Sequence, residues 1–255
     1  PQGSDPDFRT DFGAAIAGQT NLAGYPAGTI NRREFSGMSQ NGTGTAMSRN
    51  NWASTASTVL GESSYANVAL EGTVDAETRE LTVNTEMYFT ANGPSSVNIN
   101  VVLLQNNVEG PQTGAAAFYP EQILPNGNYN HHHMLRHMLT GQWGEVVSTT
   151  TMGTTYSKQY TYTLPTTING VPVNFGDLEI AAFVTEGQQT VVTGDHGPIE
   201  YTNLAQNNAT FKEATLYKEV CPDVAHPTIS IKNNGGNVMT SALVTYDVDG
   251  ANAGS

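Results

Sequence analysis

The sequence predicts a mainly β protein, an antiparallel sandwich of the immunoglobulin-like or jelly-roll kind preceded by a small α/β segment. Two observations predict this fold class. Apolar and polar residues alternate in several runs after residue 63, which is the pattern of strands with one buried and one wet face. Clusters of Gly, Asn and Ser separate these runs, as turns do between antiparallel strands.

The alternating runs give the sandwich its strands between residues 63 and 220, and turn signals at short intervals favour antiparallel pairing. The stretch 110–155 is too long for a hairpin loop, and we expect it to form a structured insertion. The expected strands are Val68–Val74, Leu81–Phe89, Val97–Leu103, Tyr156–Leu164, Leu178–Thr185, Thr190–Thr193 and Phe211–Tyr217.

The first 62 residues lack this alternation and predict helix, strand and helix as a separate N-terminal segment, 1–62. Phe12 and Ile16 recur at helical spacing, which favours a first helix between Asp7 and Asn21. A second helix is expected over Arg49–Leu60, because its apolar residues fall on one face.

A third segment, 221–255, leaves the sandwich at Cys221–Pro222. Two short alternating runs, Thr228–Lys232 and Ser241–Val248, flank the turn residues Asn233–Asn237 and predict a hairpin. Two strands alone are marginal in water, and their outer edges carry unpaired backbone groups. We therefore expect either that another copy or another surface protein completes this edge, or that the natural chain continues and completes it.

Charge and cysteine content exclude several classes of protein. Ten basic residues stand against 23 acidic ones, for a net charge of −13, which disfavours nucleic acid and anionic membrane surfaces as partners. The single cysteine, Cys221, cannot form an intrachain disulfide. No apolar run approaches the roughly 18 residues of a transmembrane helix.

No motif that supports catalysis is present. A Gly-x-Ser-x-Gly nucleophile elbow and a Gly-x-x-x-x-Gly-Lys phosphate loop are both absent. Asp247–Gly250 imitates the start of a calcium loop but lacks the Glu that closes one, and it reads as the end of a strand. The sequence therefore predicts no enzyme, assigns no catalytic, cofactor-binding or metal-ligating residue, and implies no cofactor.

Four histidines between His131 and His137 form the sharpest candidate cluster. In an extended segment His131 and His133 share a face, whereas in a helix His133 and His137 are stacked. Either arrangement presents two imidazoles, while a tight zinc site needs three or four ligands. Metal binding stays open, but a structural, hydrogen-bonded role is the better interpretation, and we expect that metal does not hold the fold together.

Three tyrosines, Tyr156, Tyr160 and Tyr162, share one face of a predicted strand with Lys158 between them. An exposed face of this kind would suit a glycan. Period-two spacing more often marks a sheet face packed against its neighbour, and we favour that interpretation.

Three segments together resemble the outer membrane protein 28-related family of Gram-negative surface proteins. The first is Asp7–Thr10 followed by Gly24–Arg32, which looks like the family's thioredoxin-like segment. The second is Asn130–Arg136 with the Trp-Gly stretch in Gly141–Gly144, and the third is the final hairpin, Ile229–Gly250, which is similar to the opening of an immunoglobulin-like module.

The resemblance implies a location at the outer membrane or outside the cell. It also implies that residues 1–62 are a thioredoxin-like remnant without the Cys-x-x-Cys half, and that Tyr25–Pro26 is a cis peptide. The function expected is structural or adhesive, in a self-associating assembly or filament. The alternatives are a metal- or glycan-binding surface module and a fragment of a thiol oxidoreductase.

Overall fold

The computed structural model describes residues 5–216, 227–248 and 251–254 and confirms a mainly β protein. The chain divides into two compact units. The first comprises Pro1–Val74 and Thr78–Glu200, and the second comprises Asp75–Glu77 and Tyr201–Ser255. The predicted boundaries after residues 62 and 220 differ from this division, because the N-terminal segment packs within the first unit and the division falls after Glu200.

The first unit contains short helices and an extended set of strands. Its helices are α1 (Asp11–Gln19), η1 (Arg49–Asn51), α2 (Trp52–Leu60), α3 (Ala115–Phe118) and η2 (Pro120–Gln122). Its strands are β1 (Ala66–Asp75), β2 (Glu80–Phe89), β3 (Val97–Gln105), β4 (Val108–Gly110), β5 (Tyr129–His131), β6 (Met134–Met138), β7 (Glu145–Val147), β8 (Thr155–Thr163), β9 (Thr167–Ile168), β10 (Val171–Pro172), β11 (Leu178–Glu186) and β12 (Thr190–Thr202).

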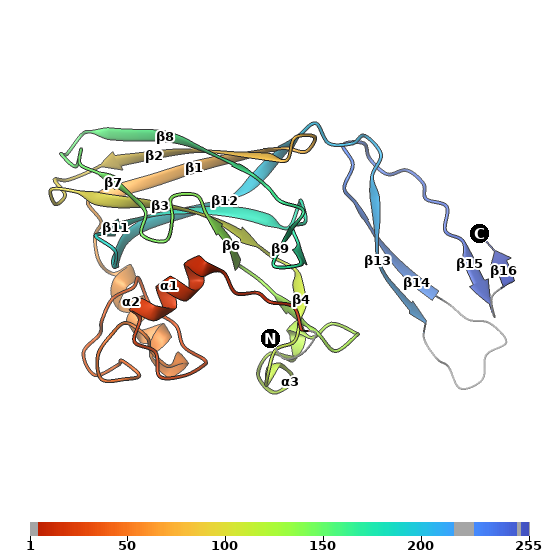
Figure 1. The fold of residues 1–255 in the computed structure, drawn as a ribbon, viewed down its shortest axis with the longest axis horizontal. Coiled ribbons are helices and arrows are strands. Elements are labelled where there is room, and N and C mark those ends of the chain that lie inside the picture. Colours follow the sequence, from red (N-terminus) through yellow and green to blue (C-terminus); the bar gives the residue numbers. More distant parts are fainter. Residues whose placement is uncertain (1–4, 217–226, 249–250, 255) are drawn as a thin grey trace. The chain divides into compact units, whose positions relative to one another are not determined.

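Eight of these strands form one curled sheet in the order β6-β3-β11-β12-β1-β2-β8, with β7 also paired to β3. Figure 1 shows β1, β2 and β8 in one layer and β3, β11 and β12 in a second layer that faces it. Helices α1 and α2 lie on the far side of the second layer (Figure 1). Because one sheet supplies both layers, the immunoglobulin-like arrangement of two separate sheets is not confirmed.

The burial pattern explains these layers. Strand β2 buries every second residue, from Leu81 to Phe89, so one face lies in the core and the other in water. Strand β3 instead buries both faces over Ile99–Leu103. The N-terminal segment covers the outer side of this layer: the Asn31 amide bonds the Val191 carbonyl at 3.1 Å, and Arg32 lies over the Phe183 ring.

Side chains join the two edges of the curled sheet. The ring of His137 on β6 stacks on Tyr162 of β8, with centroids 3.9 Å apart. Glu145 on β7 pairs with Lys158 at 2.5 Å and accepts a hydrogen bond from the Tyr156 hydroxyl at 3.3 Å. The sandwich is thus closed by side-chain contacts between β8 and the β6/β7 edge.

The N-terminal segment has the predicted helices and the predicted cis Tyr25–Pro26 peptide. Thr10 caps α1, its hydroxyl accepting a hydrogen bond from the Gly13 amide at 3.0 Å. Isolated antiparallel bridges join Met47 to Gly28 and to Ser39, and no longer strand forms in the described part of this segment. A thioredoxin-like fold of this segment is not confirmed.

The insertion 110–155 contains α3, η2, β5, β6 and β7. Of these elements, β6 and β7 belong to the main sheet. Arg136 on β6 is almost fully buried at 2% exposure. Its guanidinium donates to the carbonyls of Val171 at 2.9 Å and Ile168 at 3.4 Å, which fixes the β9–β10 hairpin. The insertion is therefore part of the core architecture.

The second unit contains two separate two-stranded sheets. Strand β13 (Ala209–Leu216) pairs with β14 (Pro227–Asn233), and β15 (Tyr246–Val248) pairs with β16 (Ala251–Gly254). The predicted pairing of Thr228–Lys232 with Ser241–Val248 does not occur. The residues of the expected turn form hydrogen bonds with an earlier segment instead: the amides of Asn234 and Gly236 donate to carbonyls in the segment 205–208.

Candidate functional site

The histidine cluster does not converge on a common point. The backbone turns at His133, whose φ is +52°, so the segment is neither a helix nor one continuous strand. His133 bonds Glu179 of β11 through its Nδ1 atom. His132 bonds the amide of Asn130 at 3.2 Å.

The other two rings of the cluster pack between aromatic side chains. His131 contacts Phe8 and Tyr129 edge-on, and its Nε2 is buried without a hydrogen-bond partner. His137 lies between Phe12 and Tyr162. Burial lowers the pKa of both His131 and His137 below the ordinary value of 6.5, because a charged imidazolium loses its solvation there.

Within residues 5–216, 227–248 and 251–254, no three His, Cys, Asp or Glu side chains are grouped so that they could hold a metal ion. The favoured structural role of the histidines accords with their contacts. Cys221 and the Asp249–Gly250 end of the calcium-like motif lie outside the described residues. In the described part of the chain, no helix has both the length and the apolar character that crossing a membrane requires.

The tyrosine face of β8 packs inward, as the period-two spacing indicated. Tyr160 is buried at 8% exposure, and burial raises the pKa of its hydroxyl. Tyr156 and Tyr162 contact the opposite edge of the sheet through Glu145 and His137. These side chains close the sandwich and leave no open aromatic platform on this face.

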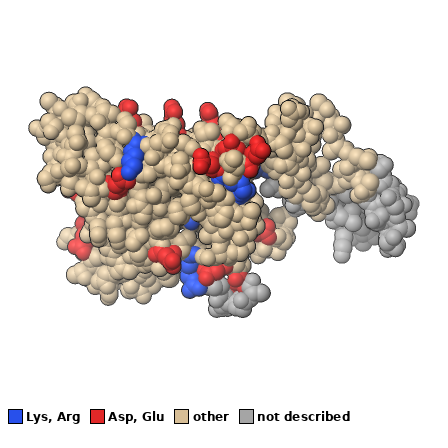
Figure 2. Space-filling view, turned by 45° about the horizontal axis from the view of Figure 1, so that its top comes forward, with Lys and Arg blue, Asp and Glu red and all other residues tan. Residues whose placement is uncertain are grey.

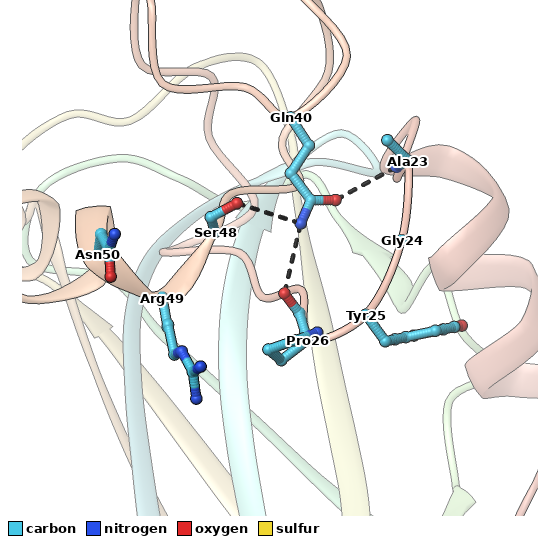
Figure 3. A pocket seen from close by; sticks show the side chains of 8 residues that line it. All are labelled: Ala23, Gly24, Tyr25, Pro26, Gln40, Ser48, Arg49 and Asn50. Atoms are coloured by element: carbon cyan, nitrogen blue, oxygen red, sulfur yellow. Dashed lines mark hydrogen bonds between the residues drawn. The ribbon is translucent and has the colours of Figure 1, made fainter. Parts of the chain in front are cut away.

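A pocket of about 530 Å³ lies instead beside the cis Tyr25–Pro26 peptide in the N-terminal segment. We call it the Gln40 pocket. Figure 3 shows Gln40 at its centre, tying together the segments that form the wall. The residues that line it are Ala23, Gly24, Tyr25, Pro26, Gln40, Ser48, Arg49 and Asn50.

The Gln40 amide uses both of its polar atoms to hold this wall. Its Oε1 accepts from the Ala23 amide at 3.2 Å, and its Nε2 donates to the Pro26 carbonyl at 3.3 Å and to Ser48 Oγ at 3.4 Å. The Tyr25 side chain is 83% exposed. Its ring also borders a smaller, mostly apolar pocket of about 230 Å³ beside α1.

Arg49 gives the Gln40 pocket its charge. Its guanidinium lies over the Phe118 ring, 4.3 Å from the centroid, and forms no ion pair with a carboxylate of the described residues. Most of the surface visible in Figure 2 carries no formal charge, and acidic side chains outnumber basic ones over the whole chain. An exposed arginine without a carboxylate is therefore a distinctive feature of this surface.

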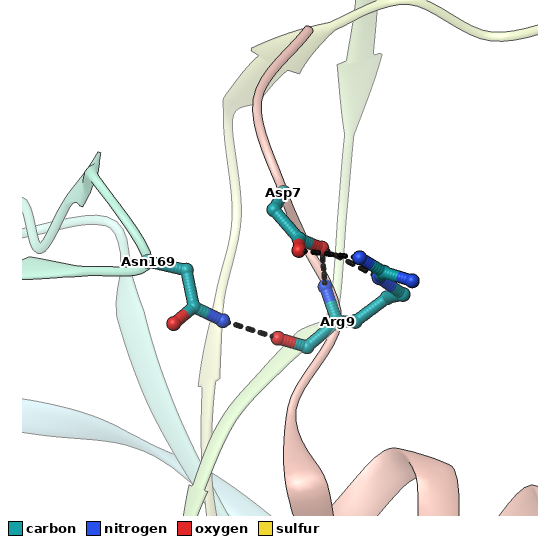
Figure 4. Close-up of polar contacts among 3 residues, drawn as sticks. All are labelled: Asp7, Arg9 and Asn169. Carbon is teal, nitrogen blue, oxygen red and sulfur yellow. Dashed lines mark hydrogen bonds and ion pairs between the residues drawn. The ribbon is translucent and has the colours of Figure 1, made fainter. Parts of the chain in front are cut away.

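Arg9 illustrates the contrast. Figure 4 shows its guanidinium held by both carboxylate oxygens of Asp7, while its carbonyl accepts a hydrogen bond from Asn169. This pairing holds the pKa of Asp7 well below its usual range. Arg9 is thus paired with its neighbour, whereas Arg49 has no carboxylate partner among the described residues.

Sequence reasoning did not identify the Gln40 pocket. Its lining comes from three segments, 23–26, residue 40 and 48–50, which the fold brings together. The predicted cis peptide at Tyr25–Pro26 was the one signal at this location, and it marked a bend without indicating which residues face it.

Large apolar side chains are exposed in the second unit. Phe211 on β13 is 61% exposed, and Val238 and Leu243 are exposed to 85% and 81%. Ile229 and Ile231 on β14 are half-buried. Where its side chains are described, the β13–β14 sheet therefore does not bury its apolar residues as the sheet of the first unit does.

Comparisons with known proteins bear on the identity of the chain. The family model described as outer membrane protein Omp28 matches residues 14–195. Among curated proteins, none matches the sequence. A solved structure similar to part of the chain is that of the sporulation control protein Spo0M from Bacillus subtilis, with 13% identity, a TM-score of 0.36 and coverage of 69% of each chain.

Proposed function

This chain belongs to the outer membrane protein Omp28 family, and we propose that it is a non-enzymatic structural or adhesive protein that binds other protein chains through its second unit. Membership of the family points to an outer-membrane or surface location.

The observation that carries this proposal is the architecture of the second unit. The β13–β14 and β15–β16 pairs are two-stranded sheets, and pairs of this size are marginal alone. Phe211 and Leu243 expose apolar area that association would remove from water. Strand addition at such an edge supplies backbone hydrogen bonds as well as apolar contact.

The polar groups of the first unit support a non-enzymatic role. His133 bonds Glu179, and His131 and His137 pack between aromatic rings, so these imidazoles serve the fold. Buried Arg136 holds two backbone carbonyls. His133 and Arg136 have hydrogen-bond partners within the fold, and His131 and His137 have aromatic ones.

Self-association of the full chain tests the proposal directly. We expect the weight-average mass in sedimentation velocity to rise with protein concentration. The double substitution Phe211→Ser with Leu243→Ser removes exposed apolar area from the second unit and should suppress that rise. Leu60→Ser is the matched control, since Leu60 is 85% exposed at the end of α2 in the first unit.

A monodisperse monomer at every concentration would contradict self-association. A mass increase that the double variant retains and Leu60→Ser abolishes would place the contact in the first unit and contradict the role of the second. Circular dichroism of each variant establishes that the β structure is intact before the masses are compared.

A further inference from the structure

We propose that Asn41–Gly42 is a site of spontaneous covalent modification, at which the asparagine side chain deamidates to aspartate and isoaspartate. The site lies in the N-terminal segment of the first unit, so the inference goes beyond the function proposed for the second unit. The sequence offers five candidates of the same chemistry, and the fold distinguishes one from the rest. The five pairs are Asn41–Gly42, Asn92–Gly93, Asn126–Gly127, Asn169–Gly170 and Asn234–Gly235.

The reaction uses the backbone nitrogen of the glycine as its nucleophile, and glycine places no side chain beside that nitrogen. The Gly42 nitrogen attacks Cγ of Asn41, the bond from Cγ to the side-chain nitrogen breaks, and ammonia leaves with the proton of the Gly42 amide. Water then opens the five-membered succinimide, which returns a proton to the ring nitrogen and forms a carboxylate. Addition at the Cγ carbonyl gives aspartate, while addition at the main-chain carbonyl gives isoaspartate, which has an extra methylene in its main chain.

In three of the five pairs, a hydrogen bond occupies the glycine amide that would attack. These bonds run from Gly93 to the Thr150 carbonyl at 2.8 Å, from Gly127 to the Leu124 carbonyl at 2.8 Å, and from Gly235 to Oδ1 of Asn233 at 3.0 Å. Attack requires this bond to break, and an amide hydrogen bond contributes about 1 kcal/mol net. Together with the backbone movement that ring closure needs, the loss should slow the reaction about tenfold or more.

The pair Asn169–Gly170 is restrained in another way. It forms the turn between β9 and β10, with φ of +50° and +76°. The Asn169 side chain donates to the Arg9 carbonyl at 2.5 Å, and the buried Arg136 holds the carbonyl of Ile168. Ring closure turns both the side chain and the backbone of Asn169 and disturbs these contacts, so we expect this pair to react second.

Asn41–Gly42 has neither restraint. In the part of the chain that the structure describes, the Gly42 amide donates to no acceptor, and a Cβ on Gly42 would meet no atom within 4 Å. Both residues are exposed. The Asn41 side chain forms one surface hydrogen bond, from its Nδ2 to Oδ1 of Asn21 at 3.1 Å. This pair can therefore reach the geometry of attack at the loss of few contacts.

The modification alters a loop that is closed by a hydrogen bond from the Gln40 amide to the Ala46 carbonyl at 2.8 Å. Conversion replaces the Asn41 donor by carboxylate oxygens that face Oδ1 of Asn21, and it adds a negative charge to a chain of net charge −13. Isoaspartate also lengthens the main chain inside this closed loop. We therefore expect the modified loop to open more readily between Gln40 and Ala46.

Peptide mapping by mass spectrometry tests the site in the full chain, after ageing at neutral pH in isotope-labelled water. Each conversion incorporates one oxygen atom of the water. In the folded chain we expect Asn41 to incorporate label at least about tenfold faster than Asn92, Asn126 and Asn234, with Asn169 between them. In concentrated urea the hydrogen bonds are lost, and the five pairs should react at similar rates.

Two variants connect the modification with its effects. Asn41→Gln keeps an amide on a longer side chain, which cannot close the five-membered ring, and it should suppress the first acidic species in isoelectric focusing. Asn169→Gln is the matched control and should retain that species. In the aged wild type, amides of residues 40–46 should exchange with deuterium faster than in fresh protein, and Asn41→Gln should show no such change on ageing.

Three results would overturn the inference: conversion of Asn41 no faster than that of Asn92, Asn126 and Asn234 in the folded chain, a lead of Asn41 that is as large in urea, and an acidic species that forms as fast in Asn41→Gln as in the wild type. Unchanged exchange of residues 40–46 after ageing would overturn the expected opening of the loop.

Discussion

The two units of this protein use the same sequence pattern with different results. Leu81 and Val83 on β2 alternate with polar residues and are fully buried, because a facing layer of the curled sheet covers them. Ile229 and Ile231 on β14 alternate in the same way and remain half-buried in a two-stranded sheet. Alternation thus specifies a strand, whereas burial requires enough strands to close a core.

The largest effect expected from this comparison is the difference in stability between two Phe→Ala variants. Phe89→Ala removes a fully buried ring from the core of the first unit and should lower its free energy of unfolding by about 3–5 kcal/mol. Phe211→Ala removes an exposed ring and should change stability by less than about 0.5 kcal/mol. Denaturant unfolding of both variants measures the difference, and similar losses would break the comparison.

Substitutions at two glycines test how closely the two layers of the first unit pack. A Cβ on Gly72 of β1 would lie 2.5 Å from Cδ1 of Ile180, so Gly72→Ala forces a core side chain to move and should cost about 1–3 kcal/mol. A Cβ on Gly197 of β12 would meet no atom within 4 Å. Gly197→Ala should therefore be neutral or stabilise the protein by up to about 1 kcal/mol. Thermal melting compares the stabilities of the two variants. An equal loss of melting temperature in both would contradict close packing of the two layers at Gly72.

The smallest effect expected is a pH dependence at the seam of the sandwich. The folded-state pKa of His137 is lowered by burial, so the unfolded chain binds a proton more readily. Stability is therefore complete above the ordinary pKa of 6.5 and falls as the pH drops below it. His137→Phe keeps a ring against Tyr162 and removes the titrating group.

Melting curves of the wild type and of His137→Phe across this range measure the effect. The wild type should lose more melting temperature than the variant as the pH falls below 6.5. Carboxylates contribute equally to both proteins, so the difference reports the histidine. Parallel losses would show that the proton on His137 is not linked to folding.

The strands with clear alternation could be predicted from the sequence, and so could the two helices of the N-terminal segment. Strands β6 and β7 could not, because they are short and β6 contains Arg136 at a core position. That arginine is buried because it bonds the carbonyls of Val171 and Ile168, which are remote in sequence. Alternation in a single strand carries no information about such a partner.

The strand that pairs with β14 could not be predicted from the neighbouring sequence either. The Asn233–Asn237 stretch has the composition of a hairpin turn, but the amides of Asn234, Gly236 and Asn237 donate to carbonyls in the segment 205–208. These contacts align β14 with β13. Turn composition therefore indicated a bend correctly, while the partner strand was decided by hydrogen bonds to an earlier segment.

The candidate site was the least predictable feature. The histidines drew attention because they are adjacent in sequence, yet in the fold they point to different partners. The Gln40 pocket draws on residues from three segments, and none of these segments contains a binding motif. Its charge comes from Arg49, and the absence of a carboxylate partner for Arg49 among the described residues is a property of the folded chain.

Hydrogen exchange followed by mass spectrometry tests most directly the claim that the first unit is closed and the second needs a partner chain. At low protein concentration, amides of β3 and β11 should exchange only through global unfolding, while amides of β13 and β14 should exchange through local opening. Protection of β13 and β14 should then increase as the concentration rises. Equal protection of both regions at low concentration, unchanged on concentrating the protein, would contradict the account.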